Sequence, residues 1–322
     1  MKNLVFIIAY AFFMMNFGCD TQKQDLVRIN HLGYSDVEYI SSRDTVLTST
    51  INGRIFIEVN GNKEKKLLTQ VNDEIYDIIF SPINDYIFAA TYQSGVIVIH
   101  KGTGKIVKRL QTPFWCTGLD LNHKENILAG ACVNGNVYFW DINKGFERNQ
   151  LSNKSPAFAV KFYNNDQNIV IAGYNISFWE LDGHRLVKRI SPHTTTIPAI
   201  DVDWQKKILV SCSFDKKASI IDLDNYSVKH SLSHPNFPIK DRSGKIVNVP
   251  IPLALTSCKI LNNKLVTAGA DHTVRVWDVK TGELIKTYTG HPGAVSNIDF
   301  SFDQKQVASV GLKGELRFWN LE

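Results

Sequence analysis

The chain has 322 residues, of which 44% are hydrophobic and 21% are charged, a composition typical of a folded globular protein and too apolar for a disordered one. The net charge of +5 is mild, so it excludes a polycationic arm and gives no reason to expect DNA or RNA as a partner. Beyond the N-terminus no apolar run approaches the roughly 18 residues of a membrane-spanning helix. A length near 300 usually indicates two domains, although an all-β propeller or barrel of this size can be a single unit.

Residues 1–18 have the pattern of a secretory signal peptide. Lys2 precedes an unbroken apolar stretch from Leu4 to Met15, and the polar run DTQKQD starts directly after Cys19. A charged start, a short apolar core and a small residue at the cleavage point are the features of a cleaved signal. The core is also short for a transmembrane helix. We therefore expect an exported protein, and the alternative is an uncleaved N-terminal anchor helix.

The end of this segment, Gly18-Cys19, resembles a bacterial lipobox, except that Asn16 stands where an aliphatic residue is usual. The resemblance implies that Cys19 becomes the lipidated first residue of the mature protein. Several acyl chains on one cysteine anchor a protein stably, whereas a single chain is marginal. We predict a short tether over residues 19–24 and a lipid anchor in the bacterial cell envelope, in the inner or the outer membrane.

The other four cysteines each lie in an apolar, strand-like segment, and their spacing matches no zinc or haem motif. They are Cys116, Cys132, Cys212 and Cys258. We expect small buried apolar residues. An oxidising compartment also allows a disulfide, and the pair would be Cys116 and Cys132, which lie on strands expected to be adjacent.

Seven similar strand cores recur along the mature chain, each rich in β-branched and aromatic residues. The clearest repeat, GADHTVRVWDVKTGELIKTYTGH, spans Gly269 to His291 and reads as turn, strand, turn, strand. The equivalent positions of the seven cores are Ile57, Ile99, Trp140, Trp179, Ile221, Trp277 and Trp319. They are separated by 42, 41, 39, 42, 56 and 42 residues. A period near 40 with about four strands per unit is typical of propeller blades. We predict an all-β, single seven-bladed β-propeller over residues 25–322, with four antiparallel strands per blade.

These repeats resemble the WD-repeat (WD-40) family, most clearly in blade 6, where Trp277-Asp278 is followed by Gly290-His291. The resemblance implies a structural tetrad of His, Ser or Thr, Asp and Trp within a blade. In blade 6 its members are His234, Thr267, Asp271 and Trp277. Blade 7 has His291, Ser309 and Trp319 but Leu312-Lys313 in place of the Asp turn, and blade 5 has His193, Ser211 and Asp215 but no Trp.

The chain ends three residues after Trp319, so blade 7 has no outer strand of its own. The N-terminal segment LVRINHLGYSDVEYI has the same order of strand, turn and strand as LIKTYTGHPGAVSNI in blade 6. We therefore expect Leu26 to Ile29 to complete blade 7. Such an N-terminal strand closes the ring and removes open sheet edges.

One segment breaks the period, because blades 5 and 6 are separated by about 15 extra residues. The extra residues fall in His234 to Pro252, where four prolines bracket a basic turn that includes Lys240, Arg242 and Lys245. The resemblance places such a loop on the top face, beside the central channel. Long loops on a rigid scaffold are often functional, and the alternative is a tolerated surface insertion.

No catalytic motif is present: the sequence lacks HExxH, GxSxG, a P-loop, an EF-hand loop and a Rossmann glycine pattern. The nine histidines are scattered along the chain, and the acidic residues stand at turn positions, where they cap backbone groups. We therefore expect no catalytic residue, no metal and no cofactor. The alternative is a catalytic site assembled at the channel from residues of several blades, which spacing in the sequence does not exclude.

In the WD-repeat family, positions that flank the first core residue of each inner strand reach the top face and often contact partners. Carried over by position, blades 1 to 4 offer acidic and aromatic side chains, and the insertion offers basic ones. The candidates are Asp36, Glu38, Glu74, Tyr76, Trp115, Phe158, Lys240, Arg242 and Lys245. Aromatic residues surrounded by charges suit protein recognition, although each could also serve packing between blades.

The sequence thus predicts a non-catalytic scaffold that binds a protein or peptide through the top face, in an envelope complex. We expect it to be monomeric by itself and to bind no nucleic acid. The alternative function is a propeller enzyme or a glycan-binding propeller with a site at the central channel.

Overall fold

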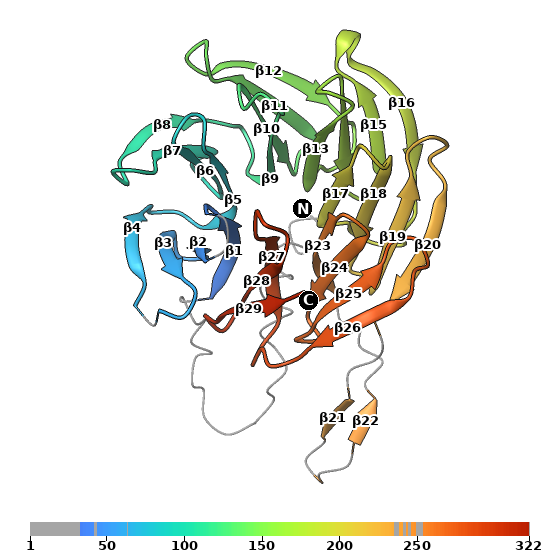
Figure 1. Ribbon diagram of the computed structural model, residues 1–322. Helices are drawn as coiled ribbons and strands as arrows, with labels where there is room; N and C mark the ends of the chain where they lie inside the picture. Colours follow the sequence, from blue (N-terminus) through green and yellow to red (C-terminus); the bar gives the residue numbers. More distant parts are fainter. Residues whose placement is uncertain are drawn as a thin grey trace.

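Seven antiparallel sheets arranged around a central channel form the molecule (Figure 1). The structure is a computed structural model, and it describes residues 33–41, 44–62, 64–234, 238–240, 243, 246–248 and 254–321. Each sheet is one blade, and in each blade the first strand lies next to the channel. The predicted all-β seven-bladed propeller is confirmed.

The strands follow in simple order from the channel outward. Blade 1 contains β1 (Tyr34–Tyr39), β2 (Thr45–Thr50), β3 (Arg54–Val59) and β4 (Lys66–Gln70). Blade 2 contains β5 (Ile75–Ser81), β6 (Tyr86–Thr91), β7 (Val96–His100) and β8 (Ile106–Leu110). Blade 3 contains β9 (Cys116–Leu121), β10 (Ile127–Cys132), β11 (Asn136–Asp141) and β12 (Glu147–Ser152).

Blade 4 contains β13 (Ala159–Tyr163), β14 (Asn168–Ala172), β15 (Ile176–Glu180) and β16 (Arg185–Ile190), with a short 3₁₀ turn η1 (Asp182–His184) before β16. Blade 5 contains β17 (Ala199–Asp203), β18 (Ile208–Cys212), β19 (Lys217–Asp222) and β20 (Val228–Ser233). Blade 6 contains β23 (Leu255–Leu261), β24 (Lys264–Gly269), β25 (Val274–Asp278) and β26 (Leu284–Tyr288).

Blade 7 has three strands within the described residues, β27 (Val295–Phe300), β28 (Gln306–Gly311) and β29 (Leu316–Asn320). The segment predicted to supply its fourth strand, Leu26 to Ile29, lies outside the described residues. Blades 7 and 1 nevertheless pack together, because one hydrophobic cluster combines side chains of both. In this cluster the rings of Tyr39 and Phe318 meet edge to face with centroids 6.3 Å apart.

The core lies between neighbouring blades. The second and third strands of most blades are largely apolar on both faces and buried, as in VIVIH of β7, because each sheet is covered on both sides by other sheets. One cluster combines Phe88 and Val98 of blade 2 with Tyr138 and Trp140 of blade 3. Packing between adjacent blades therefore holds the ring together.

The insertion between blades 5 and 6 forms a separate two-stranded hairpin of β21 (Pro238–Lys240) and β22 (Ile246–Asn248). Figure 1 draws this hairpin outside the outline of the blades, and not beside the channel as the sequence led us to expect. Of the three basic candidates in it, Arg242 and Lys245 lie outside the described residues, and no side-chain position is described for Lys240.

Candidate functional site

A bulge at the start of the inner strands decides which residues reach the top face, the face that carries the turns between second and third strands. In blade 2 the register shifts between Ile75 and Asp77, and blade 1 has the same shift between Tyr34 and Asp36. The equivalent first residues are Tyr34, Ile75, Cys116, Leu255 and Val295. Asp36 and Glu38 were predicted on the interpretation that Val37, which they flank, occupies this position of blade 1, three residues too far along.

Two predicted binding residues, Asp36 and Glu38, therefore do not occupy the top-face position that was predicted for them. They lie further down β1, in the wall of the channel, and the residues that flank Tyr34 are Gly33 and Ser35. Asp36 is only 2% exposed. Its carboxylate accepts hydrogen bonds from the backbone amides of Val37 and Ile78, at 2.7 and 2.6 Å. A buried, fully bonded carboxylate cannot contact a partner, so the role of Asp36 is structural.

The same kind of bond joins five of the seven neighbouring pairs of blades: an aspartate of one inner strand accepts a hydrogen bond from a backbone amide of the next blade. The donor–acceptor distances lie between 2.5 and 2.9 Å. The five pairs are Asp36 with Ile78, Asp77 with Leu119, Asp120 with Phe162, Asp201 with Ile260, and Asp299 with Tyr39. Each pair gives a backbone amide near the channel an acceptor on the neighbouring blade, so these hydrogen bonds help to hold adjacent blades in register.

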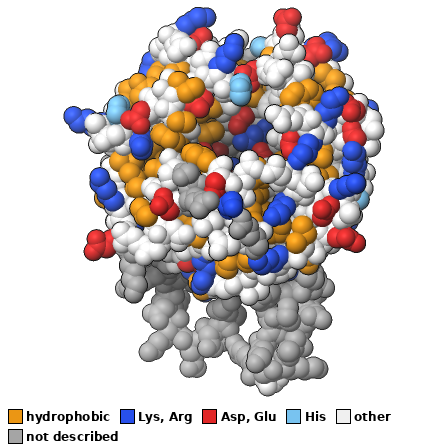
Figure 2. All heavy atoms as spheres, viewed as in Figure 1, with side chains coloured by type: hydrophobic (Ala, Val, Ile, Leu, Met, Phe, Trp, Pro, Cys, Tyr) orange, Lys and Arg blue, Asp and Glu red, His pale blue; other side chains and the backbone are white. Residues whose placement is uncertain are grey.

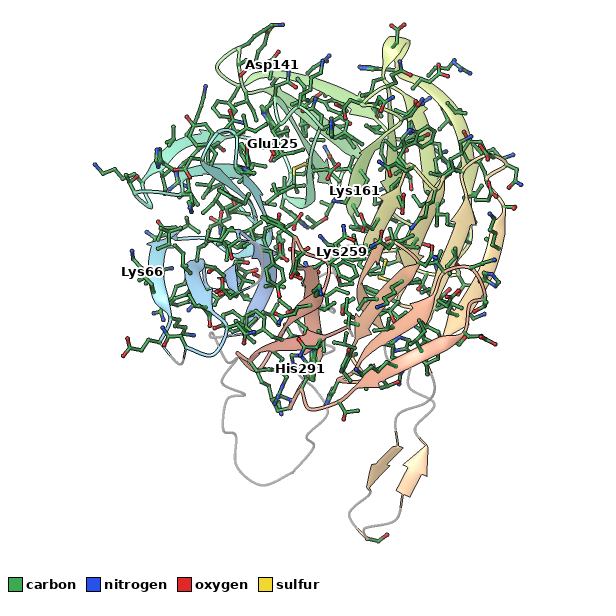
Figure 3. All side chains as sticks on the ribbon, in the orientation of Figure 1. Lys66, Glu125, Asp141, Lys161, Lys259 and His291 are labelled. Atoms are coloured by element: carbon green, nitrogen blue, oxygen red, sulfur yellow. A yellow bond between two sulfur atoms is a disulfide. The ribbon has the colours of Figure 1, made fainter. Side chains whose placement is uncertain are left out.

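Two lysines balance part of this negative charge. Lys161 Nζ lies 2.8 Å from Asp120 Oδ1, and Lys259 Nζ lies 3.0 Å from Asp299 Oδ1. Figure 3 shows both lysines at the centre of the ring, and Figure 2 shows a hollow there with acidic and basic side chains inside. Burial and the neighbouring Asp299 raise the pKa of Glu38 to about 8, although both lysines oppose the shift. The two ion pairs thus connect blade 3 to blade 4 and blade 6 to blade 7.

The predicted tetrad of blade 6 is assembled in the structure. His234 Nδ1 lies 2.9 Å from Asp271 Oδ2, and His234 Nε2 lies 2.7 Å from Thr267 Oγ1. Trp277 Nε1 donates to the same Thr267 Oγ1 at 2.8 Å. Arg275 adds an ion pair to Asp271 at 2.6 Å. These buried residues link the loop before blade 6 to its second and third strands, which is a structural role.

Blade 7 has a complete tetrad, contrary to the sequence interpretation. His291 Nε2 lies 2.6 Å from Ser309 Oγ, and Trp319 Nε1 donates to that oxygen at 2.7 Å. The missing carboxylate comes from Glu315, whose Oε1 lies 3.0 Å from His291 Nδ1. The longer Glu side chain reaches the histidine over Gly311, where a Cβ would lie 2.0 Å from Glu315 Oε1. The sequence did not indicate this carboxylate, because the turn has Leu312-Lys313 where the repeat has an aspartate.

Blade 5 keeps the His193 and Asp215 contact at 3.2 Å and the His193 and Ser211 contact at 2.9 Å, with Ile221 in place of the tryptophan.

The remaining predicted binding residues face the top of blades 2, 3 and 4. Trp115 and Tyr76 are half-buried, as is Phe158, and Glu74 is exposed.

The structure adds aromatic residues to this surface that the sequence analysis did not find. Tyr92 and Tyr174 lie in the turns between the second and third strands of blades 2 and 4, and Phe114 precedes Trp115. Their exposed fractions are 36%, 43% and 48%. The ring of Tyr92 lies 5.1 Å from that of Trp115, and the ring of Tyr174 lies 6.0 Å from that of Phe158. The signal was an aromatic residue just after the second strand in blades 2 and 4.

We call this set of side chains the aromatic face. Its members lie on the top of three consecutive blades: Glu74, Tyr76, Tyr92, Phe114, Trp115, Phe158 and Tyr174. Thr117 of blade 3 links two of these blades, because its hydroxyl donates to the backbone oxygen of Phe158 at 3.0 Å. Exposed aromatic side chains on a rigid scaffold can bind another protein without a large loss of entropy.

The cysteines divide into two pairs. Cys116 and Cys132, which face each other across β9 and β10, form a disulfide, as the sequence had left open. Cys212 and Cys258 are buried free thiols in adjacent blades. Cys19 lies outside the described residues.

Within the described ranges, no three or more His, Cys, Asp and Glu side chains are grouped so that they could hold a metal ion. In the same part of the chain there is no helix with the length and apolar character needed to cross a bilayer.

Comparisons with known proteins agree with the fold. A family model described as "WD domain, G-beta repeat" matches residues 255–278 and 282–320, which lie in blades 6 and 7. The solved structure of the WD40 beta propeller domain of Doa1 is similar with a TM-score of 0.75 and 12% identity, over 90% of this chain and 93% of that one.

Among curated relatives, WD repeat-containing protein 91 of Gallus gallus is 23% identical over 220 residues, which are 60% of this chain and 28% of the relative. Nuclear distribution protein PAC1 of Arthroderma otae is 28% identical over 150 residues, or 45% and 31% of the two chains. F-box-like/WD repeat-containing protein TBL1X of Mus musculus is 30% identical over 227 residues, or 59% and 43%. The chain spans less than half the length of these relatives.

Proposed function

We propose that this WD-repeat β-propeller is a non-catalytic scaffold that binds a protein or peptide partner through its aromatic face. The observation that carries the proposal is the aromatic face itself, which gathers six aromatic side chains over three blades. Aromatic anchors dominate binding energy at many protein interfaces. Asp36, Asp120 and Asp299 at the channel pair with lysines or with backbone amides, which favours a structural role for these groups over a catalytic one.

Capture of a partner tests this proposal. The affinity-tagged full chain is produced in its own cells, and proteins that co-purify are identified and quantified. Trp115→Ala, Tyr76→Ala and Phe158→Ala should each weaken capture, since truncating a central aromatic anchor commonly costs about 2 kcal/mol, or roughly thirtyfold in affinity.

Phe302→Ala and Ile83→Ala are matched controls. Phe302 and Ile83 are 57% and 71% exposed and lie in turns between first and second strands, on the opposite face. Both variants should capture the partner as the wild type does. Capture that is unaffected by every aromatic-face substitution would rule out this surface, and a glycan in place of a protein among the bound material would favour a glycan-binding propeller.

We further propose that the protein is exported and held at a bacterial membrane by lipid on Cys19, so that the scaffold acts in an envelope complex. The signal-like residues 1–18 and the lipobox-like Gly18-Cys19 support this placement. Metabolic labelling with a radioactive fatty acid checks it. The wild type should carry the label and Cys19→Ala should lose it, whereas a labelled Cys19→Ala variant would refute the anchor.

A further inference from the structure

One part of the aromatic face combines three rings with a carboxylate. The amide of Tyr92 donates to the backbone oxygen of Glu74 at 3.1 Å, so these two residues lie opposite each other. The Tyr76 hydroxyl donates to Glu74 Oε2 at 3.4 Å, and the Tyr92 ring lies 5.1 Å from the Trp115 ring. We call Glu74, Tyr76, Tyr92 and Trp115 the Glu74 cluster. It brings π-faces and a negative charge to one place between blades 2 and 3.

The backbone around the cluster is fixed by the neighbouring aspartate. Asp73 Oδ2 accepts hydrogen bonds from the amides of Gln93 and Ser94, at 2.9 and 2.7 Å, and Asp73 Oδ1 accepts one from the amide of Glu74 at 2.9 Å. These bonds tie the turn that carries Tyr92 to the loop that carries Glu74. A site that is ordered before binding loses less entropy when a ligand arrives.

The charge within the cluster's own segments is negative, while outside them the Arg148 guanidinium donates to the backbone oxygen of Gln111 at 3.0 Å. The three segments that form the cluster, residues 71–76, 91–95 and 111–117, contain two acidic residues, Asp73 and Glu74, and no Lys or Arg. The Asp73 carboxylate already accepts hydrogen bonds from backbone amides. Among the described residues, the Glu74 carboxylate accepts a hydrogen bond only from the Tyr76 hydroxyl, and that bond is longer than usual. Glu74 is exposed, so its carboxylate is open to a ligand.

We propose that the Glu74 cluster binds a cationic side chain, arginine or lysine, of the protein partner. A cation is attracted to the negative face of an aromatic ring, most strongly for Trp and Tyr. The Glu74 carboxylate would at the same time accept a charge-assisted hydrogen bond from the guanidinium or ammonium group. An apolar side chain would use the rings but gain nothing from the carboxylate. Arginine is the better fit, because its planar group stacks on rings and donates in a fork.

This inference rests on the proposed function for the partner's identity, but it is tested separately. The probe is the peptide acetyl-Gly-Ser-Arg-Ser-Gly-amide, compared with the same peptide carrying citrulline, its uncharged isostere. The full chain is labelled with ¹⁵N-tryptophan, and the indole signal lost in Trp115→Phe is assigned to Trp115. The arginine peptide should shift this signal in a saturable way, about tenfold more tightly than the citrulline peptide. A lysine peptide should bind more weakly than arginine and more tightly than its norleucine analogue.

Two variants test whether the Glu74 carboxylate causes the preference for the arginine peptide over the citrulline peptide. Glu74→Gln should weaken the arginine peptide about tenfold and leave the citrulline peptide unchanged. Glu64→Gln is the matched control, because Glu64 is exposed near the turn before β4 on the opposite face. Equal binding of charged and neutral peptides, no shift with any cation, or an unaffected Glu74→Gln variant would each overturn the inference. Capture of a partner that depends on Trp115 but not on Glu74 would overturn it too and leave the proposed function standing.

Discussion

Asp271→Ala should destabilise the protein by about 3–5 kcal/mol, the largest effect we expect from a single substitution. Asp271 is 1% exposed and binds His234, Arg275 and the Thr273 hydroxyl. Removing the carboxylate leaves the guanidinium of Arg275, a residue only 6% exposed, without its partner. Denaturant unfolding followed by tryptophan fluorescence measures the change.

The control is Asp182→Ala, because Asp182 is exposed and lies in η1 away from any tetrad. It should change stability by less than about 0.5 kcal/mol. Burial alone would raise the pKa of Asp271, but His234 and Arg275 lower it to about 2 from an ordinary 3.8. The stability contributed by this carboxylate is therefore complete above pH 4 and lost as the pH falls toward 2, a loss absent from the variant. Equal unfolding midpoints of Asp271→Ala and the wild type would refute the assigned role.

Asp299→Ala should destabilise the protein by about 2–4 kcal/mol and loosen the junction of blades 7 and 1. Asp299 Oδ2 accepts the amide of Tyr39 at 2.8 Å, and its Oδ1 pairs with Lys259. The variant leaves a buried amide without an acceptor and a lysine without its nearest carboxylate. The backbone amide of Tyr39 should exchange its hydrogen faster in the variant than in the wild type. The variant should also unfold at a lower denaturant concentration.

Asp224→Ala removes an exposed ion pair instead, because Lys207 Nζ and Asp224 Oδ1 are 2.6 Å apart but the two side chains are 49% and 62% exposed. Such pairs contribute little, so its stability should stay within about 1 kcal/mol of the wild type. Asp299→Asn keeps an acceptor for Tyr39 and should fall between the alanine variant and the wild type. Unchanged exchange at Tyr39 in Asp299→Ala would show that packing alone closes the ring.

The number of blades could be predicted from the sequence because it depends on a repeated signal. The strand cores recur about every 40 residues, and the spacing survives where Ile221 replaces the tryptophan. The position of Asp36 was predicted wrongly because Val37 was taken as the equivalent of Ile75, whereas the bulge after Tyr34 corresponds to the bulge after Ile75 in blade 2. In blade 1 the bulge follows Tyr34 and moves Asp36 into the channel wall. A carboxylate in a strand therefore looked like a surface residue in the sequence but joins two blades in the structure.

The candidate site was only partly predictable for a similar reason. Glu74, Tyr76 and Trp115 were found because they flank the start of an inner strand, a position that the repeat identifies. Tyr92 was missed, because it follows the second strand and does not flank an inner strand, and its contact with Trp115 crosses a blade boundary. Glu315 was missed because a longer side chain from another position can replace the expected aspartate. Contacts between repeats depend on three-dimensional packing that one repeat does not reveal.

Hydrogen exchange on the captured complex tests the central claim, that the aromatic face binds the partner, most directly. Free and bound protein are compared amide by amide under the same conditions. We predict new protection in residues 72–76, 92–95, 111–117, 153–158 and 173–175, which carry the aromatic face on blades 2 to 4. Protection confined to the turns around Ile83 and Phe302, on the opposite face, would contradict it.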